Sequence, residues 1–89
     1  MSVYLIVYNQ MVHDHMATFK VSAKVKSFGT WANFMPGSYL VETEMNSVQM
    51  KEEIEKVIAS EDFAFITKID KDNAGCVHPG ALAWIAERV

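Results

Sequence analysis

Two histidines flank an aspartate at His13, Asp14 and His15, and imidazole and carboxylate groups are common ligands of zinc and other divalent metals. The usual set of three protein ligands is incomplete in this stretch, so we expect a solvated pair of loop histidines rather than a metal centre. His13 and His15 are the candidates for metal binding, and the residues predict no cofactor.

A polar segment at 70–78 holds other residue types that could support chemistry. It begins DKDNAG, like a calcium-binding loop, but Ala74 stands at the fifth position and Ala81 at the twelfth, where a bidentate acid is required. We therefore expect a turn. Cys76 is the only cysteine and has only His78 near it in sequence as a base, so we expect a buried or half-buried structural residue and not a nucleophile.

Basic residues are concentrated in one part of the chain. Residues 17–37 contain Lys20, Lys24 and Lys26 and no acidic residue, whereas most of the acidic residues fall between 42 and 62. The formal net charge is −3, and proteins that bind nucleic acids non-specifically are usually basic. Lys20, Lys24 and Lys26 are therefore the candidates for nucleic-acid binding, through one locally basic face.

Hydrophobic periodicity then predicts the elements that carry these residues. We expect strands at 3–9, 30–35, 39–43 and 63–69, and helices from near Asp14, a suitable N-cap, to Phe28 and from Ser47 to about Ala59. This order, β-α-β-β-α-β, is the ferredoxin-like split arrangement of an α+β fold. Right-handed crossovers give a four-stranded antiparallel sheet in the order 4-1-3-2 with both helices on one face.

The chain forms a single domain, with a core at 3–69 and a tail at 70–89. A short helix beginning at Pro79 and a terminal strand are both open for the tail. Local signals mark the ends of the elements. Gly29 is expected to end the first helix in a left-handed conformation, and Gly37 to supply the positive φ of a Pro-Gly turn. Asn46 and Gln49 have the spacing of a capping box.

The first expected strand, VYLIVYN, is apolar on both faces, which is typical of a central strand covered on both sides. Two helices cover only one face, so the tail or a second copy must cover the other. The chain is 51% hydrophobic, more than the interior of so small a domain can bury. We therefore expect a homodimer, with Tyr4, Ile6 and Tyr8 in its interface.

Four stretches carry a family resemblance: VYLIVYNQ, KSFGTWANF, SYLVETEMNSVQMKEEI and EDFAFITKI. Together they resemble the SinR-like group of small proteins, which are similar to the small CRISPR-associated proteins that form the central dimer of the spacer-integration complex. The resemblance covers about residues 3–69, and its most specific pieces are the FGTW junction and the order of the elements. It implies a ferredoxin-like protomer and a homodimer packed through its sheets.

The resemblance also bears on catalysis. Where nuclease activity is claimed for the family, an Asp in a Tyr-Asp pair after the first strand is held to bind a divalent metal at the dimer axis. The matching pair here is Tyr8-Asn9, and a neutral amide is a poor magnesium ligand beside a carboxylate. Asp14 could substitute only if the loop folds back. Asn9 and Asp14 are the catalytic candidates, and Mg²⁺ or Mn²⁺ is implied only if the chain is a nuclease.

Three classes of function follow. We expect a non-catalytic, homodimeric SinR-like protein with a scaffold or nucleic-acid-associated role. The alternatives are a metal-dependent endonuclease of the CRISPR-associated type and a ferredoxin-like protein-interaction or small-ligand module without nucleic acid.

No apolar run approaches the ~18 residues that span a bilayer. The apolar start of the chain lacks the basic region and cleavage site of a signal peptide. We therefore expect a cytoplasmic protein with no membrane partner.

Overall fold

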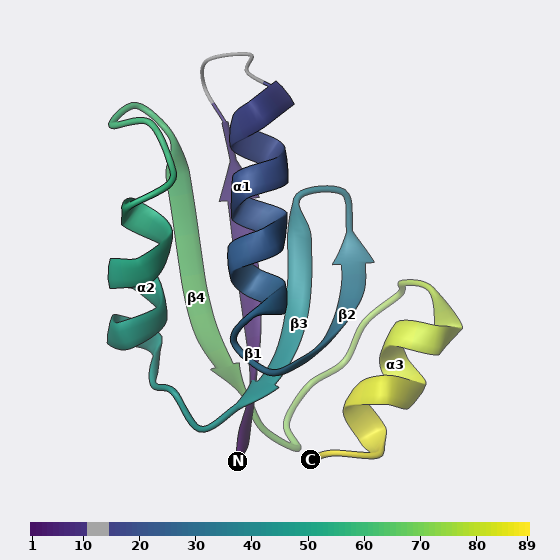
Figure 1. The fold of residues 1–89 in the computed structure, drawn as a ribbon. Helices are drawn as coiled ribbons and strands as arrows, with labels where there is room; N and C mark the ends of the chain where they lie inside the picture. The colour runs from purple at the N-terminus through teal and green to yellow at the C-terminus, as the bar shows by residue number, and fades with distance from the viewer. Residues whose placement is uncertain (11–14) are drawn as a thin grey trace.

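The computed structural model describes residues 1–10 and 15–89, without the side chains of His15 and Ala17. Within this range the chain forms four strands and three helices, whose arrangement can be followed in Figure 1. Their bounds are β1 Ser2–Asn9, α1 His15–Lys26, β2 Thr30–Met35, β3 Ser38–Thr43, α2 Ser47–Glu55, β4 Phe63–Ile69 and α3 Pro79–Ala86. The expected order of the first six elements is confirmed, and the tail forms a helix that begins at the expected proline.

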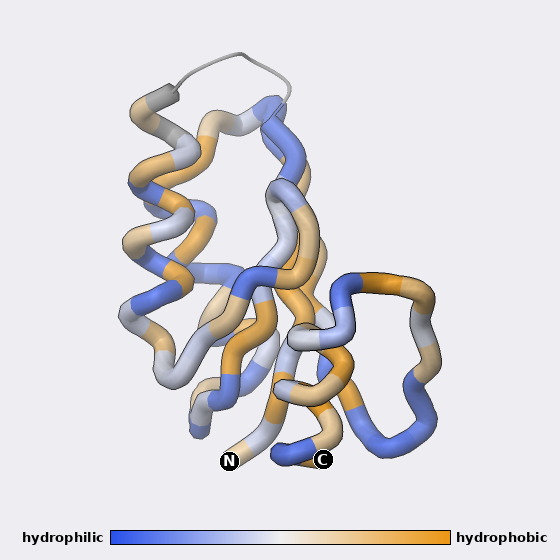
Figure 2. The backbone as a smooth tube through the Cα atoms, turned by 90° about the vertical axis from the view of Figure 1, so that its right-hand side faces the viewer, coloured by the Kyte–Doolittle hydropathy of each residue, from blue (hydrophilic) through white to orange (hydrophobic). Residues whose placement is uncertain are grey.

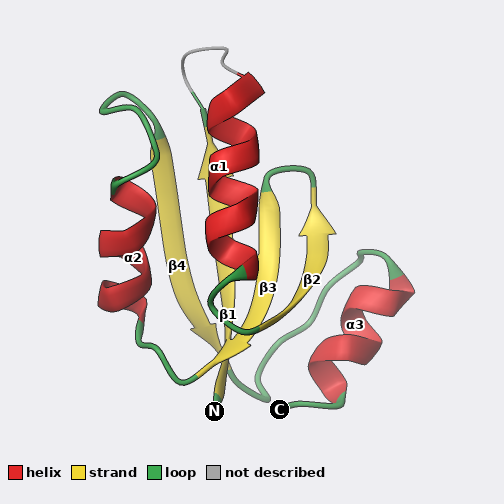
Figure 3. Cartoon of the chain, in the orientation of Figure 1, coloured by secondary structure: helices red, strands yellow, loops and turns green. Residues whose placement is uncertain are grey.

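The four strands form one antiparallel sheet in the order β2-β3-β1-β4 (Figure 3). This is the expected order 4-1-3-2 read from the other edge. Ile6, in the middle of β1, lies between Tyr39 of β3 and Ile66 of β4. The first strand is therefore central, as its apolar composition predicts, and β2 and β4 are the edges of the sheet.

Helices α1 and α2 cover one face of the sheet, and the larger hydrophobic core lies beneath them. Val21 and Val25 of α1 are fully buried, as are Met50 and Ile54 of α2. They pack against alternate residues of the two central strands, which are Tyr4, Ile6, Tyr8, Tyr39 and Val41. Because side chains alternate along a strand, this contact fixes which half of β1 faces the helices.

Helix α3 lies against the opposite face, as the side view in Figure 2 shows. Ala81 and Ile85 of this helix are buried against Leu40 of β3 in a second, smaller core. Arg88, just after this helix, contacts the sheet: its Nε lies 3.6 Å from Glu42 Oε1 of β3. Its guanidinium carbon also lies 3.9 Å from the centroid of the Trp84 ring. The tail thus covers part of the face that two helices leave open.

Both helices on the first face are shorter than expected. Helix α1 ends at Lys26 and not at Phe28, and α2 ends at Glu55 and not near Ala59. Short-range hydrogen bonds between Ala59 and Asp62 account for the second difference. The amide of Ala59 donates to Asp62 Oδ2 at 3.1 Å, and the amide of Asp62 donates to the carbonyl of Ala59 at 3.1 Å. These bonds form a turn that draws the chain out of the helix towards β4.

The two glycines singled out in the sequence behave differently. Gly37 has the expected positive φ, 77°. Gly29 has no positive φ, so its expected left-handed conformation is wrong. It is instead packed against β3: a Cβ at this position would lie 2.2 Å from the carbonyl oxygen of Glu42.

The expected start of α2 is confirmed by two reciprocal bonds. The amide of Gln49 donates to Asn46 Oδ1 at 2.8 Å, and the amide of Asn46 donates to Gln49 Oε1 at 2.9 Å. This capping box satisfies two backbone amides at the helix N-terminus.

Candidate functional site

The catalytic and metal candidates occupy the end of β1 and the segment that follows. Asn9 is exposed at the last position of β1, opposite Phe63 of β4. His13 and Asp14, and with them the expected N-cap, lie outside the described residues, as does the side chain of His15. Within the described part of the chain, no group of three or more His, Cys, Asp or Glu side chains could hold a metal ion.

A buried carboxylate near this end of the sheet was missed by the sequence reasoning. The hydroxyl of Tyr8 donates to Asp62 Oδ2 at 2.8 Å, and Asp62 is only 9% exposed. This oxygen also accepts the amide of Ala59. Tyr8 and Asn9 point to opposite faces because they are adjacent in a strand. The carboxylate of Asp62 therefore joins the α2–β4 turn to the helix-covered core, on the side of the sheet away from Asn9.

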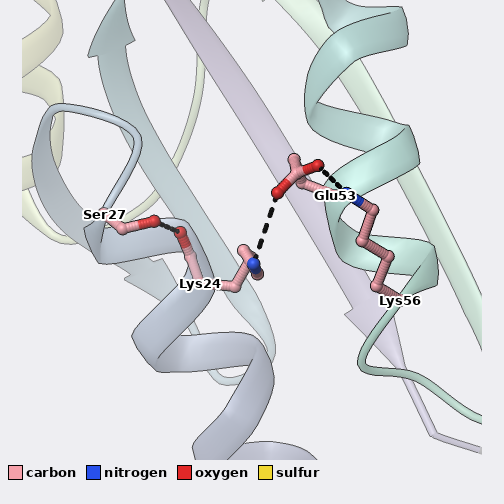
Figure 4. Close-up of polar contacts among 4 residues, drawn as sticks. All are labelled: Lys24, Ser27, Glu53 and Lys56. Carbon is pink, nitrogen blue, oxygen red and sulfur yellow. Dashed lines mark hydrogen bonds and ion pairs between the residues drawn. The ribbon is translucent and has the colours of Figure 1, made fainter.

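The three candidate lysines of α1 do not share one partner or one environment. Lys24 Nζ lies 3.4 Å from Glu53 Oε1 of α2, and Lys56 pairs with the other carboxylate oxygen of Glu53 (Figure 4). The hydrogen bond from Lys56, followed by that from Lys24, lowers the pKa of the Glu53 carboxyl group. The charge of Lys24 is thus directed to an acidic helix rather than to solvent.

Of the other two lysines, Lys26 lies on the side of α1 away from that ion pair, whereas Lys20 is exposed one helical turn before Lys24. Lys26 Nζ lies 4.4 Å from the centroid of the Trp31 ring, at a distance typical of a cation–π contact. Trp31 is 38% exposed, so the indole and the ammonium are presented together at the surface. Lys20 is exposed one residue after Phe19, which is 70% exposed.

The residues expected in a dimer interface are core residues of the single chain. Tyr4, Ile6 and Tyr8 are 8%, 0% and 7% exposed and pack beneath α1 and α2. An interface formed by them would require both helices to leave the sheet. Their assignment to an interface is therefore corrected.

Exposed apolar side chains instead gather on the opposite face, beyond the part that α3 covers. Val7, Phe63 and Phe65 are 38%, 63% and 68% exposed. Val7 lies directly opposite Phe65 in the pairing of β1 with β4, and Phe63 precedes Phe65 on the same face. We call these three residues the open sheet surface. The alternation of FAFITKI places both phenylalanines on one face and is the sequence signal for it.

A groove of about 670 Å³ lies between the β2–β3 hairpin and α3. Phe34, Met35 and Trp84 supply apolar lining. His78 also lines the groove, and its Nδ1 accepts the amide of Gly80 at 3.0 Å, so this nitrogen serves as the N-cap of α3.

Cys76 is exposed in the preceding segment, against the expectation that it is buried or half-buried. None of the described helices is long and apolar enough to span a membrane.

No family model, curated protein or solved structure matches this chain. The SinR-like resemblance therefore stays a prediction. The surfaces described above are the basis for inferring a function.

Proposed function

We propose that this chain is a non-catalytic, homodimeric scaffold protein of the SinR-like type that associates with nucleic acid. The observation that carries the proposal is the open sheet surface, where Phe63 and Phe65 expose about two thirds of their area to solvent. Large exposed apolar groups that are contiguous typically mark a site of protein association.

The position of these residues favours a second copy as the partner. Strand β4 has a neighbouring strand on one side only among the described elements, and its sequence contains neither proline nor glycine. Such edges pair readily with other strands unless they are covered or charged. The one charged residue of β4, Lys68, lies opposite Tyr4 and therefore points to the helix-covered face, away from the open sheet surface. A twofold axis brings the same patch of both copies together. Each phenylalanine that becomes fully buried contributes roughly 1.5–3 kcal/mol.

The non-catalytic part of the proposal rests on Asn9. This residue is on the same face as the open sheet surface, opposite Phe63, so a dimer through this face has one copy of it from each protomer in or beside the interface. The resemblance implies a metal-binding carboxylate at this position in the family's nucleases. An amide in both copies leaves such a site without two negative charges, and divalent metals in nuclease sites are held mainly by carboxylates.

Multi-angle light scattering during gel filtration tests the dimer. We expect the wild-type protein to elute as a dimer at micromolar concentration and the Phe65→Ser variant to shift to the monomer. Phe19→Ser is the matched control, because Phe19 is a phenylalanine of similar exposure on α1, on the other side of the sheet. A monomeric wild type, or a Phe65→Ser protein that dimerises as well as the control, contradicts the proposal.

A further inference from the structure

The geometry points to a binding surface for single-stranded nucleic acid formed by Phe19, Lys20 and Lys26 of α1 and Trp31 of β2. We call it the α1–β2 surface. The inference rests on the nucleic-acid part of the proposed function and adds the substrate class and the residues that meet it. Bases stack on the exposed phenylalanine, and the two lysines neutralise phosphates.

The first observation is the outward position of an aromatic ring. Val21 and Val25 turn one side of α1 into the core, and Phe19 is 70% exposed. Phe19 and Lys26 are seven residues apart and therefore share one side of the helix, about 10 Å from each other along its axis. Lys20 follows Phe19 in the chain and is also exposed, about 100° further round the helix. An exposed ring with basic side chains around it suits a single strand, because bases stack on the ring and phosphates meet the cations.

The second observation is the charge around this surface. No acidic residue occurs between His15 and Val41 in the sequence, so α1 and β2 carry none. The first acid after this stretch is Glu42, whose carboxylate is paired with Arg88 at the end of α3, on the opposite face of the sheet. On the α2 side, Glu53 is neutralised by Lys24 and Lys56. A polyanion can therefore approach the α1–β2 surface despite the net charge of −3.

The third observation separates single strands from duplexes. A duplex hides its bases within the stack, so Phe19 would meet only the sugar-phosphate backbone, and non-specific duplex binding depends on many phosphate contacts. Lys24 is engaged with Glu53, which leaves Lys20 and Lys26 as the cations of this surface. Two cations with an exposed ring suit a single strand, in which stacking supplies much of the affinity.

Fluorescence anisotropy with a labelled oligo-dT of about eight nucleotides tests the inference, because a strand of this length engages a single protomer. We expect Phe19→Ser to weaken binding about tenfold. Lys20→Ala and Lys26→Ala should each reduce the slope of log K against log salt by about 0.7. Val48→Ser and Lys71→Ala are the controls, since they remove an exposed apolar side chain on α2 and an exposed charge before α3, and they should bind as the wild type does. Circular dichroism verifies that every variant is folded.

The outcomes separate this inference from the proposed function. If the wild type binds oligo-dT and Phe19→Ser binds equally well, or if a duplex of the same length binds more tightly, the α1–β2 surface is overturned while nucleic-acid association stands. If poly-glutamate displaces the strand at equal charge, the surface recognises acidic chains and the inference is also overturned. If no nucleic acid binds at low salt, both fail, and the oligomeric state is still decided by light scattering.

Discussion

The sequence predicts correctly that a glycine is required at position 29, but it predicts the wrong reason for this requirement. A glycine after a helix suggests a left-handed cap, but the constraint on Gly29 comes from β3, where the carbonyl oxygen of Glu42 occupies the space of a side chain. The Asn46 and Gln49 capping box is confirmed, because its bonds join residues three apart. Local bonds can be predicted from spacing, whereas contact with a distant strand cannot.

The packing of Gly29 gives a prediction at this scale. Gly29→Ala should destabilise the protein by about 2 kcal/mol or more, because a Cβ 2.2 Å from a backbone oxygen forces the α1–β2 connection away from β3. Urea denaturation measures the change. Gly75→Ala is the control, since its Cβ would meet nothing nearer than Leu82 at 3.7 Å, and its effect should stay within about 0.5 kcal/mol. Equal effects of the two changes would show that the approach to Glu42 is relieved at little cost.

At the scale of elements, the strands and the order of the first six elements follow from the sequence, since hydrophobic periods of two and 3.6 residues are local properties. The end of α2 does not, because Asp62, whose carboxylate accepts the Ala59 amide, is also bound by the hydroxyl of Tyr8 in the distant strand β1. The tail stays open between helix and strand for a similar reason. Its short apolar run suits either state, and the outcome is decided by packing of Ile85 against Leu40.

An isoleucine-to-alanine change should have different consequences in the two cores. Ile54 and Ile85 are 0% and 4% exposed, but Ile54 belongs to the large core under α1 and α2 and Ile85 to the small one under α3. Ile54→Ala should lower the free energy of global unfolding by ~2–5 kcal/mol. Ile85→Ala should mainly release α3, so that its amides exchange hydrogen faster while those of β1 keep their protection.

Hydrogen exchange followed by mass spectrometry separates the two cases. Faster exchange across all elements in Ile85→Ala, equal to that in Ile54→Ala, would mean that α3 unfolds together with the rest of the domain. Faster exchange confined to the tail would identify α3 as an independently opening cover of the sheet.

At the scale of the whole molecule, the sequence predicts that β1 is covered on both sides but not which half faces which cover. Alternate side chains of β1 point to opposite faces, and both sets are apolar. The hydrophobic pattern is therefore the same whichever set faces the helices. The sequence therefore predicts Tyr4, Ile6 and Tyr8 in an interface, whereas the structure places them in the core. Strand β4 shows which face is open. Phe63 and Phe65 are exposed and alternate with Ala64 and Ile66, and Ile66 packs against the core beneath the helices.

The same alternation leads to a prediction about catalysis. Hydrolysis of a phosphodiester by the implied mechanism needs a divalent metal to activate water and to neutralise developing charge. Asn9, on the face opposite to Tyr8, offers an amide at the position where the resemblance implies a carboxylate. We therefore expect the purified wild-type protein not to cleave single-stranded RNA or double-stranded DNA above background with Mg²⁺ or Mn²⁺.

The comparison of wild type with Asn9→Asp gives this expectation its sharpest form. If the face near Phe63 retains the shape of a metal site, the change restores one carboxylate per protomer, and metal-dependent cleavage should appear only in this variant. Asn73→Asp is the matched control, because it adds the same charge at an exposed asparagine in the segment before α3. Isothermal titration with Mn²⁺ reports metal binding independently of cleavage. Robust cleavage by the wild type that Asn9→Ala abolishes would show that an amide suffices at this position and that the chain is an enzyme. Inactive wild type with active Asn9→Asp would identify a nuclease scaffold whose charge has been lost at a single residue.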